Sequence, residues 1–235
     1  MKLPVAILAG GLATRLGSLT AKFPKVLMDI NHRPFTEYQL DLLKKAGVSR
    51  VVYCLGYLGE LVKETVGDGS RWGIQIDYIA DGPNLLGTGG ALRQALPFLG
   101  EAFLVMYGDS YLNCDYQAVE DAFLRSGKLA LMTVYRNSGQ WDTSNVVFEK
   151  GQLRLYSKNM HLPEMKYIDY GLGAFQASAW TSYSNGEQFD LAQVYQDLIK
   201  KDQLVGFEVG NRFFEIGSRS GLEETRRYLT TGGAY

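Results

Sequence analysis

The sequence predicts an α/β protein with a doubly wound, mostly parallel β-sheet and a small antiparallel insertion. Short runs rich in Val and Ile, bounded by glycine, alternate with amphipathic stretches as far as Tyr135. This alternation is typical of buried parallel strands joined by right-handed crossover helices. With 235 residues and 46% hydrophobic content, the chain is long enough to bury a full core. We expect one domain over residues 1–235.

The expected strands and helices of the first half alternate in chain order. The strands are Val5 to Ala9, Val51 to Leu55, Ile74 to Ile79, Phe103 to Tyr107 and Leu129 to Tyr135. The helices are Phe35 to Ala46, Leu58 to Val66, Gly90 to Leu99 and Tyr116 to Ser126. Each helix carries apolar residues at helical spacing, with Gly or Pro near its ends. Helices are therefore expected on both faces of the sheet.

The pattern changes after Arg136. Two short runs, Asn145 to Phe148 and Leu153 to Tyr156, flank Glu149-Lys150-Gly151-Gln152 and indicate a hairpin. We expect this hairpin to be an antiparallel insertion that covers one end of the sheet. The remaining elements are an apolar run from Tyr170 to Phe175, a helix from about Asp190 to Lys200, strands near Val205 to Val209 and Phe213 to Ile216, and a helix from Gly221 to Leu229.

Charge and cysteine content exclude several classes of protein. A net charge of -1 and a pI near 6.2 give no basic field, so we expect no nucleic-acid partner. Cys54 and Cys114 belong to no CxxC motif and cannot form a disulfide framework, which favours a reducing cytoplasm. No apolar stretch is long enough for a signal peptide or a membrane span, so we expect a soluble cytoplasmic protein without a membrane partner.

The strongest motif follows the first strand and reads Leu8-Ala9-Gly10-Gly11-Leu12-Ala13-Thr14-Arg15-Leu16. Paired glycines allow a tight turn whose N–H groups can approach phosphate oxygens, at the strand end where open α/β sheets bind ligands. Arg15 adds a forked cation. The spacing matches neither a Walker A loop nor a dinucleotide fingerprint, which argues against a Rossmann oxidoreductase. A phosphate-binding loop is predicted, and a plain turn with a surface arginine is the alternative.

Pro24-Lys25-Val26-Leu27 follows shortly afterwards. Together, GGxxTRL and PKxL resemble the sugar-1-phosphate nucleotidyltransferase family, also called nucleoside-diphosphate-sugar pyrophosphorylases. The resemblance extends along nearly the whole chain. Its further segments are Gly87-Thr88-Gly89-Gly90-Ala91-Leu92, Gly108-Asp109, Tyr156-Ser157-Lys158, Tyr170-Gly171-Leu172-Gly173 and Phe214-Glu215-Ile216-Gly217-Ser218. It implies a Rossmann-like nucleotidyltransferase fold and an enzyme that joins a nucleoside triphosphate to a sugar 1-phosphate and releases pyrophosphate.

The resemblance also implies roles for individual residues. The residues expected to bind the nucleotide are Leu8, Ala9, Gly10, Gly11, Thr14, Arg15, Lys25, Gly87, Thr88 and Gly89. Those expected to bind the sugar phosphate are Gly108, Lys158, Tyr170 and Gly171. Arg15, Lys25 and Asp109 form the expected catalytic set, and Asp109 and Glu215 the expected Mg²⁺ ligands.

These residue types suit the implied reaction. The sugar phosphate is already an ionised nucleophile, so the enzyme needs to align it with the α-phosphorus and to stabilise developing charge with cations. Mg²⁺ usually takes one or two carboxylates together with phosphate oxygens and water. The family normally has aspartate where this chain has Glu215. Its longer side chain can still bind a metal ion, but from a different position.

The acceptor and the base are less well defined. Leu86-Gly87-Thr88-Gly89-Gly90 and the short chain most resemble guanylyltransferases that act on D-glycero-D-manno-heptose 1-phosphate in surface-polysaccharide synthesis, so GTP is favoured. Uridylyltransferases for N-acetylmuramate 1-phosphate are also similar. Cytidylyltransferases for phosphocholine or phosphonates stay open, because Tyr156, Tyr167, Asp169 and Tyr170 could form a cage. A catalytically silent nucleotide-sugar-binding protein is the alternative from another class, and a homo-oligomer is left open.

Overall fold

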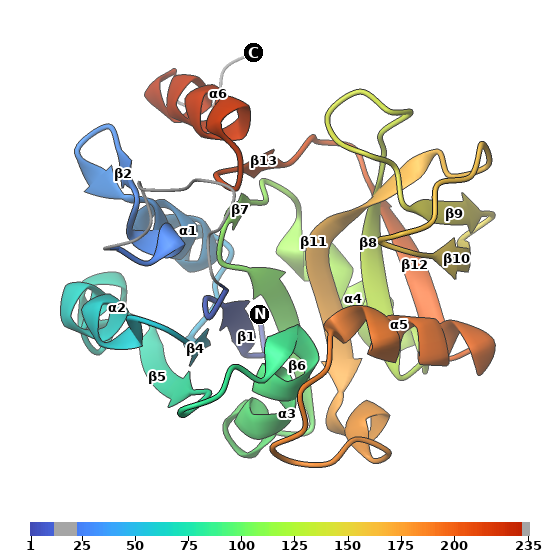
Figure 1. The fold of residues 1–235 in the computed structure, drawn as a ribbon, viewed down its shortest axis with the longest axis horizontal. Coiled ribbons are helices and arrows are strands. Elements are labelled where there is room, and N and C mark those ends of the chain that lie inside the picture. The colour runs from blue at the N-terminus through green and yellow to red at the C-terminus, as the bar shows by residue number, and fades with distance from the viewer. Residues whose placement is uncertain (12–22, 232–235) are drawn as a thin grey trace.

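The computed structural model describes residues 1–11 and 23–231. Their main element is a nine-stranded sheet with the order β5-β4-β1-β6-β11-β8-β12-β10-β9 (Figure 1). Its strands are β1 (Val5–Leu8), β4 (Arg50–Leu55), β5 (Gln75–Ala80), β6 (Ala102–Tyr107), β8 (Ala130–Arg136), β9 (Val146–Glu149), β10 (Gln152–Tyr156), β11 (Tyr167–Gln176) and β12 (Leu204–Val209). Two small sheets pair β2 (Asp29–Ile30) with β3 (Arg33–Pro34), and β7 (Ser110–Tyr111) with β13 (Phe214–Glu215).

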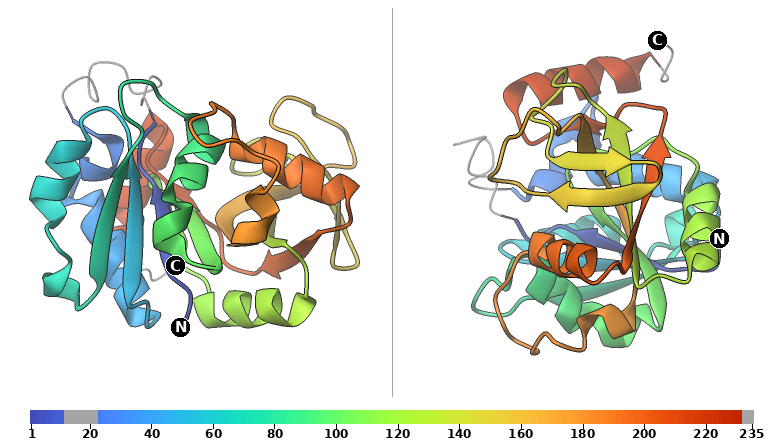
Figure 2. Two further views of the ribbon diagram at one scale, coloured as in Figure 1. Left: turned by 90° about the horizontal axis from the view of Figure 1, so that it is seen from below. Right: turned by 90° about the vertical axis from the view of Figure 1, so that its right-hand side faces the viewer.

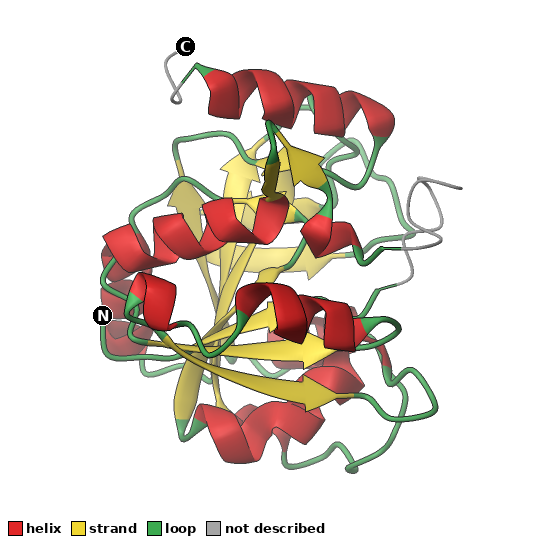
Figure 3. Cartoon of the chain, turned by 90° about the vertical axis from the view of Figure 1, so that its left-hand side faces the viewer, coloured by secondary structure: helices red, strands yellow, loops and turns green. Residues whose placement is uncertain are grey.

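Helices cover both faces of the sheet (Figures 2 and 3). They are α1 (Phe35–Lys45), α2 (Gly59–Val66), α3 (Gly87–Leu99), α4 (Tyr116–Ser126), α5 (Leu191–Lys200) and α6 (Arg219–Thr230). In β1, Val5 and Ile7 pack in the core with α1, α2 and α4, whereas Ala6 packs in the core with α3 and α5. This alternation follows from the two-residue period of a strand, and it confirms the predicted α/β class.

The sheet is mixed, which corrects the prediction that it is mostly parallel. Among the described residues, β5, β4, β1 and β6 run parallel, as predicted, but β11 lies antiparallel between β6 and β8. The reason is the connection that follows β8. The chain returns through the hairpin of β9 and β10 instead of a crossover helix, so the next long strand enters in the opposite direction.

The predicted hairpin forms, and it extends the main sheet. Gln152 in β10 pairs with Val205 in β12, and Val146 in β9 pairs with Tyr167 in β11. The right-hand view of Figure 2 shows the two hairpin strands (yellow) beside β12. The hairpin therefore forms the end of the sheet opposite β5.

Strand β11 contains a bulge. Asp169 lies opposite Val134 of β8, and Gly173 lies opposite Met132, so β11 contains two more residues than β8 over this interval. Gly171 sits inside the bulge with a φ of +100°, a conformation that residues other than glycine rarely adopt. A bulge of this kind changes the direction in which neighbouring side chains point.

The helices are short. The longest one that the structure describes is α3, of 13 residues, followed by α6, of 12 residues. None of the described helices has the length and apolar character needed to cross a bilayer.

Candidate active site

A cavity of about 270 Å³ opens at the carboxyl ends of β1 and β6. Parallel strands end at the same edge of a sheet, so their following loops meet there. The cavity is lined by Leu8, Ala9, Gly10, Gly11, Lys25, Val26, Cys54, Asp81, Leu85, Gly87, Thr88, Ala91, Tyr107, Gly108 and Asp109. We call it the smaller cavity. It brings together most of the residues that the sequence assigned to a nucleotide, and also Gly108, which was assigned to the sugar phosphate.

Glycines at and beside the smaller cavity allow close contacts that a side chain would block. A Cβ atom on Gly10 would lie 2.9 Å from the backbone nitrogen of Gly56. A Cβ atom on Gly89 would overlap the ring of Phe189. The backbone N–H of Gly89 donates a hydrogen bond to the carbonyl of Phe189 at 3.0 Å. The glycine-rich segment after residue 86 therefore packs against the segment that precedes α5.

Helix α3 begins at Gly87, three residues before the predicted start at Gly90. Thr88 consequently lies in the first helical turn, where its Oγ1 accepts a hydrogen bond from the backbone N–H of Leu191 at 2.8 Å. Leu86 also accepts one from the N–H of Phe189 at 3.0 Å. These bonds join the start of α3 to the start of α5.

Lys25 and Asp109 form an ion pair at the mouth of the smaller cavity, with 2.9 Å between Nζ and Oδ2. Lys25 begins a short 3-10 turn that the buried Val26 anchors. Gln39, a buried residue of α1, donates from Nε2 to the carbonyls of Tyr107 and Ser110, at 3.2 and 2.8 Å. The turn that carries Asp109 is thus fixed on both sides.

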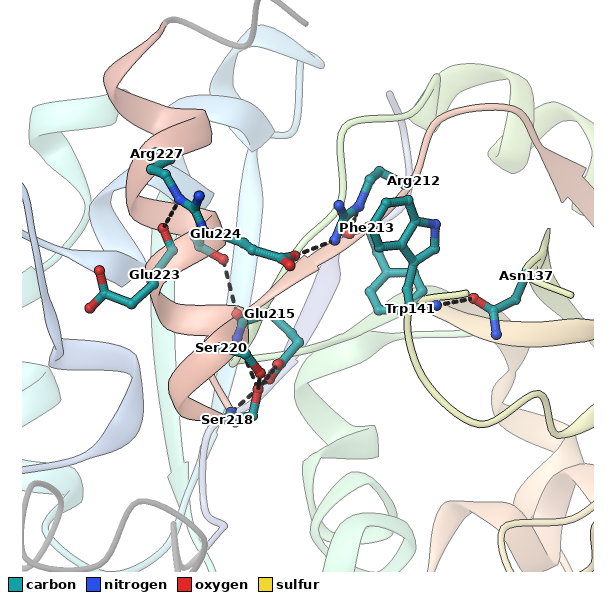
Figure 4. A network of polar contacts seen from close by, with 12 residues as sticks. Asn137, Trp141, Arg212, Phe213, Glu215, Ser218, Ser220, Glu223, Glu224 and Arg227 are labelled. Atoms are coloured by element: carbon teal, nitrogen blue, oxygen red, sulfur yellow. Dashed lines mark hydrogen bonds and ion pairs between the residues drawn. The ribbon is translucent and has the colours of Figure 1, made fainter. Parts of the chain in front are cut away.

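Glu215 ends β13, four residues before α6 begins, and its carboxylate accepts hydrogen bonds from the residues that lead into this helix (Figure 4). Its Oε2 accepts hydrogen bonds from the backbone N–H groups of Gly217 and Ser218, and its Oε1 accepts from the Ser218 hydroxyl at 2.6 Å. A Cβ atom on Gly221 would overlap the carboxylate. The positive end of the helix dipole stabilises a negative charge at this position.

Gly217 leaves a small space that three charged groups share. A Cβ atom on Gly217 would lie 2.7 Å from Oε2 of Glu215, 3.2 Å from Nζ of Lys25 and 3.4 Å from Oδ2 of Asp109. The two carboxylates and the ammonium group therefore converge on one point, although they come from three distant parts of the chain.

A second cavity, of about 750 Å³, extends from this point towards the hairpin. We call it the larger cavity. Its lining includes Lys158, Asp169, Gly171, Glu215 and, from the far wall, Arg212. Lys25, Tyr107 and Asp109 line both cavities, so the two spaces meet at the ion pair.

The sequence profile of a protein family described as nucleotidyl transferase matches residues 5–141. The chain belongs to this family. The match includes Gly10, Lys25 and Asp109, and the predicted sugar-1-phosphate nucleotidyltransferase family is confirmed.

Two relatives match this nucleotidyl transferase over most of their length. The D-glycero-alpha-D-manno-heptose 1-phosphate guanylyltransferase of Campylobacter jejuni is 28% identical, over 90% of this chain and 93% of the relative. The N-acetylmuramate alpha-1-phosphate uridylyltransferase of Neisseria meningitidis is 27% identical, over 94% and 95%. Among solved structures, HddC from Yersinia pseudotuberculosis complexed with GMP-PN superposes with a TM-score of 0.80 at 24% identity, over 97% of this chain and 99% of that chain. It supports the fold.

Lys158 of this nucleotidyl transferase reaches the larger cavity from the end of β10. It pairs with both carboxylate oxygens of Asp190, at 2.8 and 3.0 Å. Asp190 also caps α5 by accepting from the N–H of Ala192 at 2.7 Å. The lysine that the sequence assigned to the sugar phosphate is therefore held by the helix whose start contacts Thr88.

Tyr170 and Gly171 border the larger cavity in different ways. The Tyr170 side chain is only 1% exposed, and its ring packs edge-on against Phe213. The N–H of Gly171 donates to Oδ1 of Asp169 at 3.0 Å. Asp169, next to the two predicted residues, is the one that presents a charged group.

Arg212 and Trp141 close the far wall of the larger cavity. The Arg212 guanidinium lies 3.5 Å from the centre of the Trp141 ring (Figure 4). It also lies 4.4 Å from the centre of the Phe214 ring. It also pairs with Glu224 of α6 at 2.7 Å. Oδ1 of Asn137 accepts a hydrogen bond from the backbone N–H of Trp141 at 3.2 Å. These contacts join the loop after β8 to α6.

Thr14 and Arg15 lie outside the described residues. Sequence analysis missed Asp81 and Asn145 as cavity residues, and it gave Asp190 no role beyond the start of a helix. Asp81 follows β5 directly, and a carboxylate at the carboxyl end of a parallel strand is a signal that could have identified it. No sequence pattern marks Asn145 or Asp190 in this way, because their neighbours come from distant segments.

Proposed function

We propose that this enzyme transfers the nucleotidyl group of GTP to a heptose 1-phosphate, giving a nucleoside-diphosphate sugar and pyrophosphate. The observation that carries the proposal is the junction of the two cavities. Lys25 and Asp109 line both of them. A nucleotide in the smaller cavity and a sugar phosphate in the larger one would meet at this ion pair.

The reaction forms one bond and breaks another. An oxygen of the sugar phosphate attacks the α-phosphorus, and the bond from that phosphorus to the oxygen bridging to the β-phosphorus breaks. The attacking oxygen is already ionised, so no proton has to be removed. Lys25 lies where it can stabilise the charge that develops on the phosphates, while Lys158 can hold the sugar phosphate in line.

Asp109 and Glu215 fit a magnesium ion. Their oxygens face the space that a Cβ atom on Gly217 would fill, and both are oxygen donors of the kind that Mg²⁺ prefers. The described residues contain no cluster of three or more metal-ligating side chains, and Mg²⁺ in phosphate-binding enzymes often has only one or two carboxylate ligands. When bound, the ion would neutralise phosphate charge. The hydrogen bonds of Glu215 to Gly217 and Ser218 orient its carboxylate towards this space.

Asp81 supports the choice of GTP. Its carboxylate lines the smaller cavity, and one oxygen, Oδ2, accepts from the N–H of Leu86 at 3.1 Å. Burial raises the pKa of Asp81, while the bond from Leu86 lowers it. A carboxylate is an acceptor, and of the four common bases only guanine has two adjacent N–H donors on its pairing edge, at N1 and N2. A carboxylate at the position of Asp81, if it faces the base, would therefore favour guanine over uracil or cytosine.

The acceptor assignment is supported by the Campylobacter jejuni relative and by the size of the larger cavity. Its volume of about 750 Å³ has room for a seven-carbon sugar phosphate. Tyr167, one of the four residues considered for a choline cage, stacks edge-on against Phe148 and is not among the lining residues that the structure describes. A complete aromatic cage for a quaternary ammonium group is therefore not favoured.

The test is pyrophosphate release by purified protein with Mg²⁺. Each of the four ribonucleoside triphosphates is combined with the 1-phosphates of D-glycero-D-manno-heptose, mannose, glucose and N-acetylmuramate. We expect release with GTP and the heptose. Release with UTP and N-acetylmuramate 1-phosphate, or with CTP and phosphocholine or a phosphonate, would replace the substrate assignment. Binding without release in every combination would favour the silent nucleotide-sugar-binding protein. A cytoplasmic location and a homo-oligomer stay predictions.

A further inference from the structure

Gln39 is a fully buried polar residue of α1 to which the reaction steps give no role. It is not among the described residues that line either cavity. Phe35, Leu40 and Leu43 of the same helix are buried apolar residues, so an apolar side chain would suit this environment. A buried amide at such a position calls for a physical reason, because buried polar groups cost stability unless they are hydrogen-bonded.

The two ends of the Gln39 amide differ in their partners. Nε2 donates to the carbonyl of Tyr107 at 3.2 Å and to the carbonyl of Ser110 at 2.8 Å. Oε1 is buried as well, and none of the described residues donates to it. Only the nitrogen of an amide can face two carbonyl oxygens, so these two partners determine its orientation. A half-satisfied amide is costly, and its presence therefore points to a use of the donor end.

The two carbonyls that Gln39 binds lie on either side of Asp109. The N–H of Gly108 donates to the carbonyl of Leu8 at 2.9 Å, and the carbonyl of Asp109 accepts from the N–H of Ile216 at 3.0 Å. The amide of Gln39 joins the two ends of this turn from the side of α1. The backbone conformation that these bonds hold decides where the Asp109 side chain points.

The same contacts connect the turn to Glu215 and Lys25. Ser110 pairs with Glu215 in the small sheet of β7 and β13. At the start of α1, the N–H of Phe35 donates at 2.9 Å to the carbonyl of Met28, directly after the 3-10 turn that Lys25 begins. Helix α1 is therefore bonded to the segment that carries the ammonium group and to the segment that carries both carboxylates.

We propose that Gln39 is a positioning residue, which holds the Asp109 carboxylate beside Gly217 so that Asp109 and Glu215 can bind one divalent cation. The inference rests on the proposed function, because it requires these carboxylates to bind Mg²⁺. A cation that takes only two carboxylates from the protein depends on their relative position. Groups that hold metal ligands in place change metal affinity or activity about 10- to 100-fold when they are removed.

The test replaces Gln39 by methionine, which keeps the length of the side chain and removes the donor. Mn²⁺ prefers the same oxygen ligands as Mg²⁺, and its effect on the relaxation of water protons reports binding without turnover. With GTP present and no acceptor, we expect Gln39→Met to bind Mn²⁺ about tenfold more weakly than the unchanged enzyme. Its kcat should fall at low Mg²⁺ and largely recover at high Mg²⁺, with the KM for the sugar phosphate unchanged.

A double variant separates positioning from a general effect on the fold. Asp109→Asn should itself weaken Mn²⁺ binding, because an amide replaces the charged ligand. Adding Gln39→Met to Asp109→Asn should weaken it little further, since both changes act through the same ligand. A loss of packing in α1 would instead add to the effect of Asp109→Asn and would not be reversed by Mg²⁺.

Gln176→Met is the matched control. Nε2 of Gln176 donates to the carbonyl of Lys128 at 3.2 Å, and its Oε1 accepts from the Ser178 hydroxyl at 3.4 Å. Gln176 is not among the described lining residues of either cavity, so Mn²⁺ affinity and turnover should stay unchanged. Both methionine variants should melt within about 5 °C of the unchanged protein, as for the loss of one or two hydrogen bonds.

If Gln39→Met does not fold, Gln39→Asn decides. Its amide is one methylene group shorter and cannot reach both carbonyls, so we expect the same weaker binding of Mn²⁺. Failure of both variants to fold would overturn the inference, because Gln39 would then serve the fold as a whole.

Two further results would overturn the inference separately. An unchanged Mn²⁺ affinity in folded Gln39→Met, or additive effects of Gln39→Met and Asp109→Asn, would overturn the role of Gln39 and leave the proposed function in place. An unchanged enzyme that binds no Mn²⁺ with GTP and releases no pyrophosphate with any sugar 1-phosphate would overturn both.

Discussion

The two cavities are built in different ways. The smaller one lies at the carboxyl ends of parallel strands, where glycines such as Gly10 and Gly108 line it together with apolar residues such as Leu8 and Ala91. The larger one is formed by side chains such as Lys158, Asp169 and Arg212, which extend from antiparallel strands and loops. The family profile matches residues 5–141 and ends before β9, so it covers the first cavity and little of the second.

This difference predicts that the smaller cavity serves the part of the reaction that is common to different acceptors, and that the larger cavity selects among acceptors. Backbone N–H groups bind phosphate oxygens whatever the side chains are, so a phosphate site made from backbone suits every nucleotide. Side chains recognise the pattern of donors and acceptors on a particular sugar. Changes at the junction should therefore abolish the reaction with every acceptor, while changes in the larger cavity should alter the preference among acceptors.

The largest effect is expected at the junction. Lys25→Ala and Asp109→Ala should each lower kcat by at least about a hundredfold, as for other groups that stabilise charge in a transition state. Both should remain folded, since the ion pair is partly exposed. Steady-state pyrophosphate release and thermal melting measure the two properties. Lys128→Ala, which breaks an ion pair of the same 2.9 Å length with Asp202 far from the cavities, should retain activity. Near-normal turnover of either junction variant would contradict the assignment.

Lys158→Met tests the acceptor side. The substitution keeps most of the aliphatic side chain and removes the charge, so the KM for the sugar phosphate should rise about 10- to 100-fold. The KM for GTP should change little, because Lys158 lines only the larger cavity among those described. Equal changes in the KM for the sugar phosphate and the KM for GTP would contradict a role of Lys158 that is limited to the acceptor.

Asp81→Asn tests base recognition. Asparagine can accept a hydrogen bond from N1 of guanine or from its amino group but not from both, so the preference for GTP over ITP, which lacks the amino group, should fall about tenfold. The measurement is kcat/KM for the two nucleotides with one acceptor. Equal kcat/KM values for GTP and ITP with the unchanged enzyme would show that Asp81 does not recognise the amino group of the base.

The smallest effect is expected for Glu215→Asp. The shorter side chain can still provide a carboxylate, which the family normally supplies from aspartate at this position. It cannot keep all three bonds to Gly217 and Ser218. We expect a folded, active enzyme that needs a different Mg²⁺ concentration for half-maximal rate. If the variant and the unchanged enzyme need the same Mg²⁺ concentration, the Glu215 carboxylate only stabilises the start of α6 and does not bind the metal ion.

The parallel half of the molecule could be predicted from sequence because its signals are local. Alternating apolar runs marked β1, β4, β5 and β6, while the roles of Lys25 and Asp109 were predicted from the resemblance to the family. Even here, helix α3 began earlier than expected. Its first turn, which contains three glycines, reads as a loop by propensity, and only the packing of Phe189 explains why it is helical.

The antiparallel half was harder to predict because its features depend on contacts between distant segments. The position of β11 between β6 and β8 cannot be read from the apolar run Tyr170 to Phe175. The bulge that presents Asp169 arises from a register shift with β8. Likewise, Lys158 was identified only by resemblance, since its partner Asp190 lies 32 residues further along the chain.

The segment between residues 187 and 191 sets a limit on protein engineering. It accepts and donates hydrogen bonds at the start of α3 through Phe189 and Leu191, and it holds Lys158 through Asp190. A hybrid enzyme that takes its second half from a relative with another sugar would place a foreign segment against the native residues 86–90. Such a hybrid needs residues 86–90 and residues 187–191 from the same parent. An exchange meant to change the acceptor preference must therefore replace two separate segments of the chain.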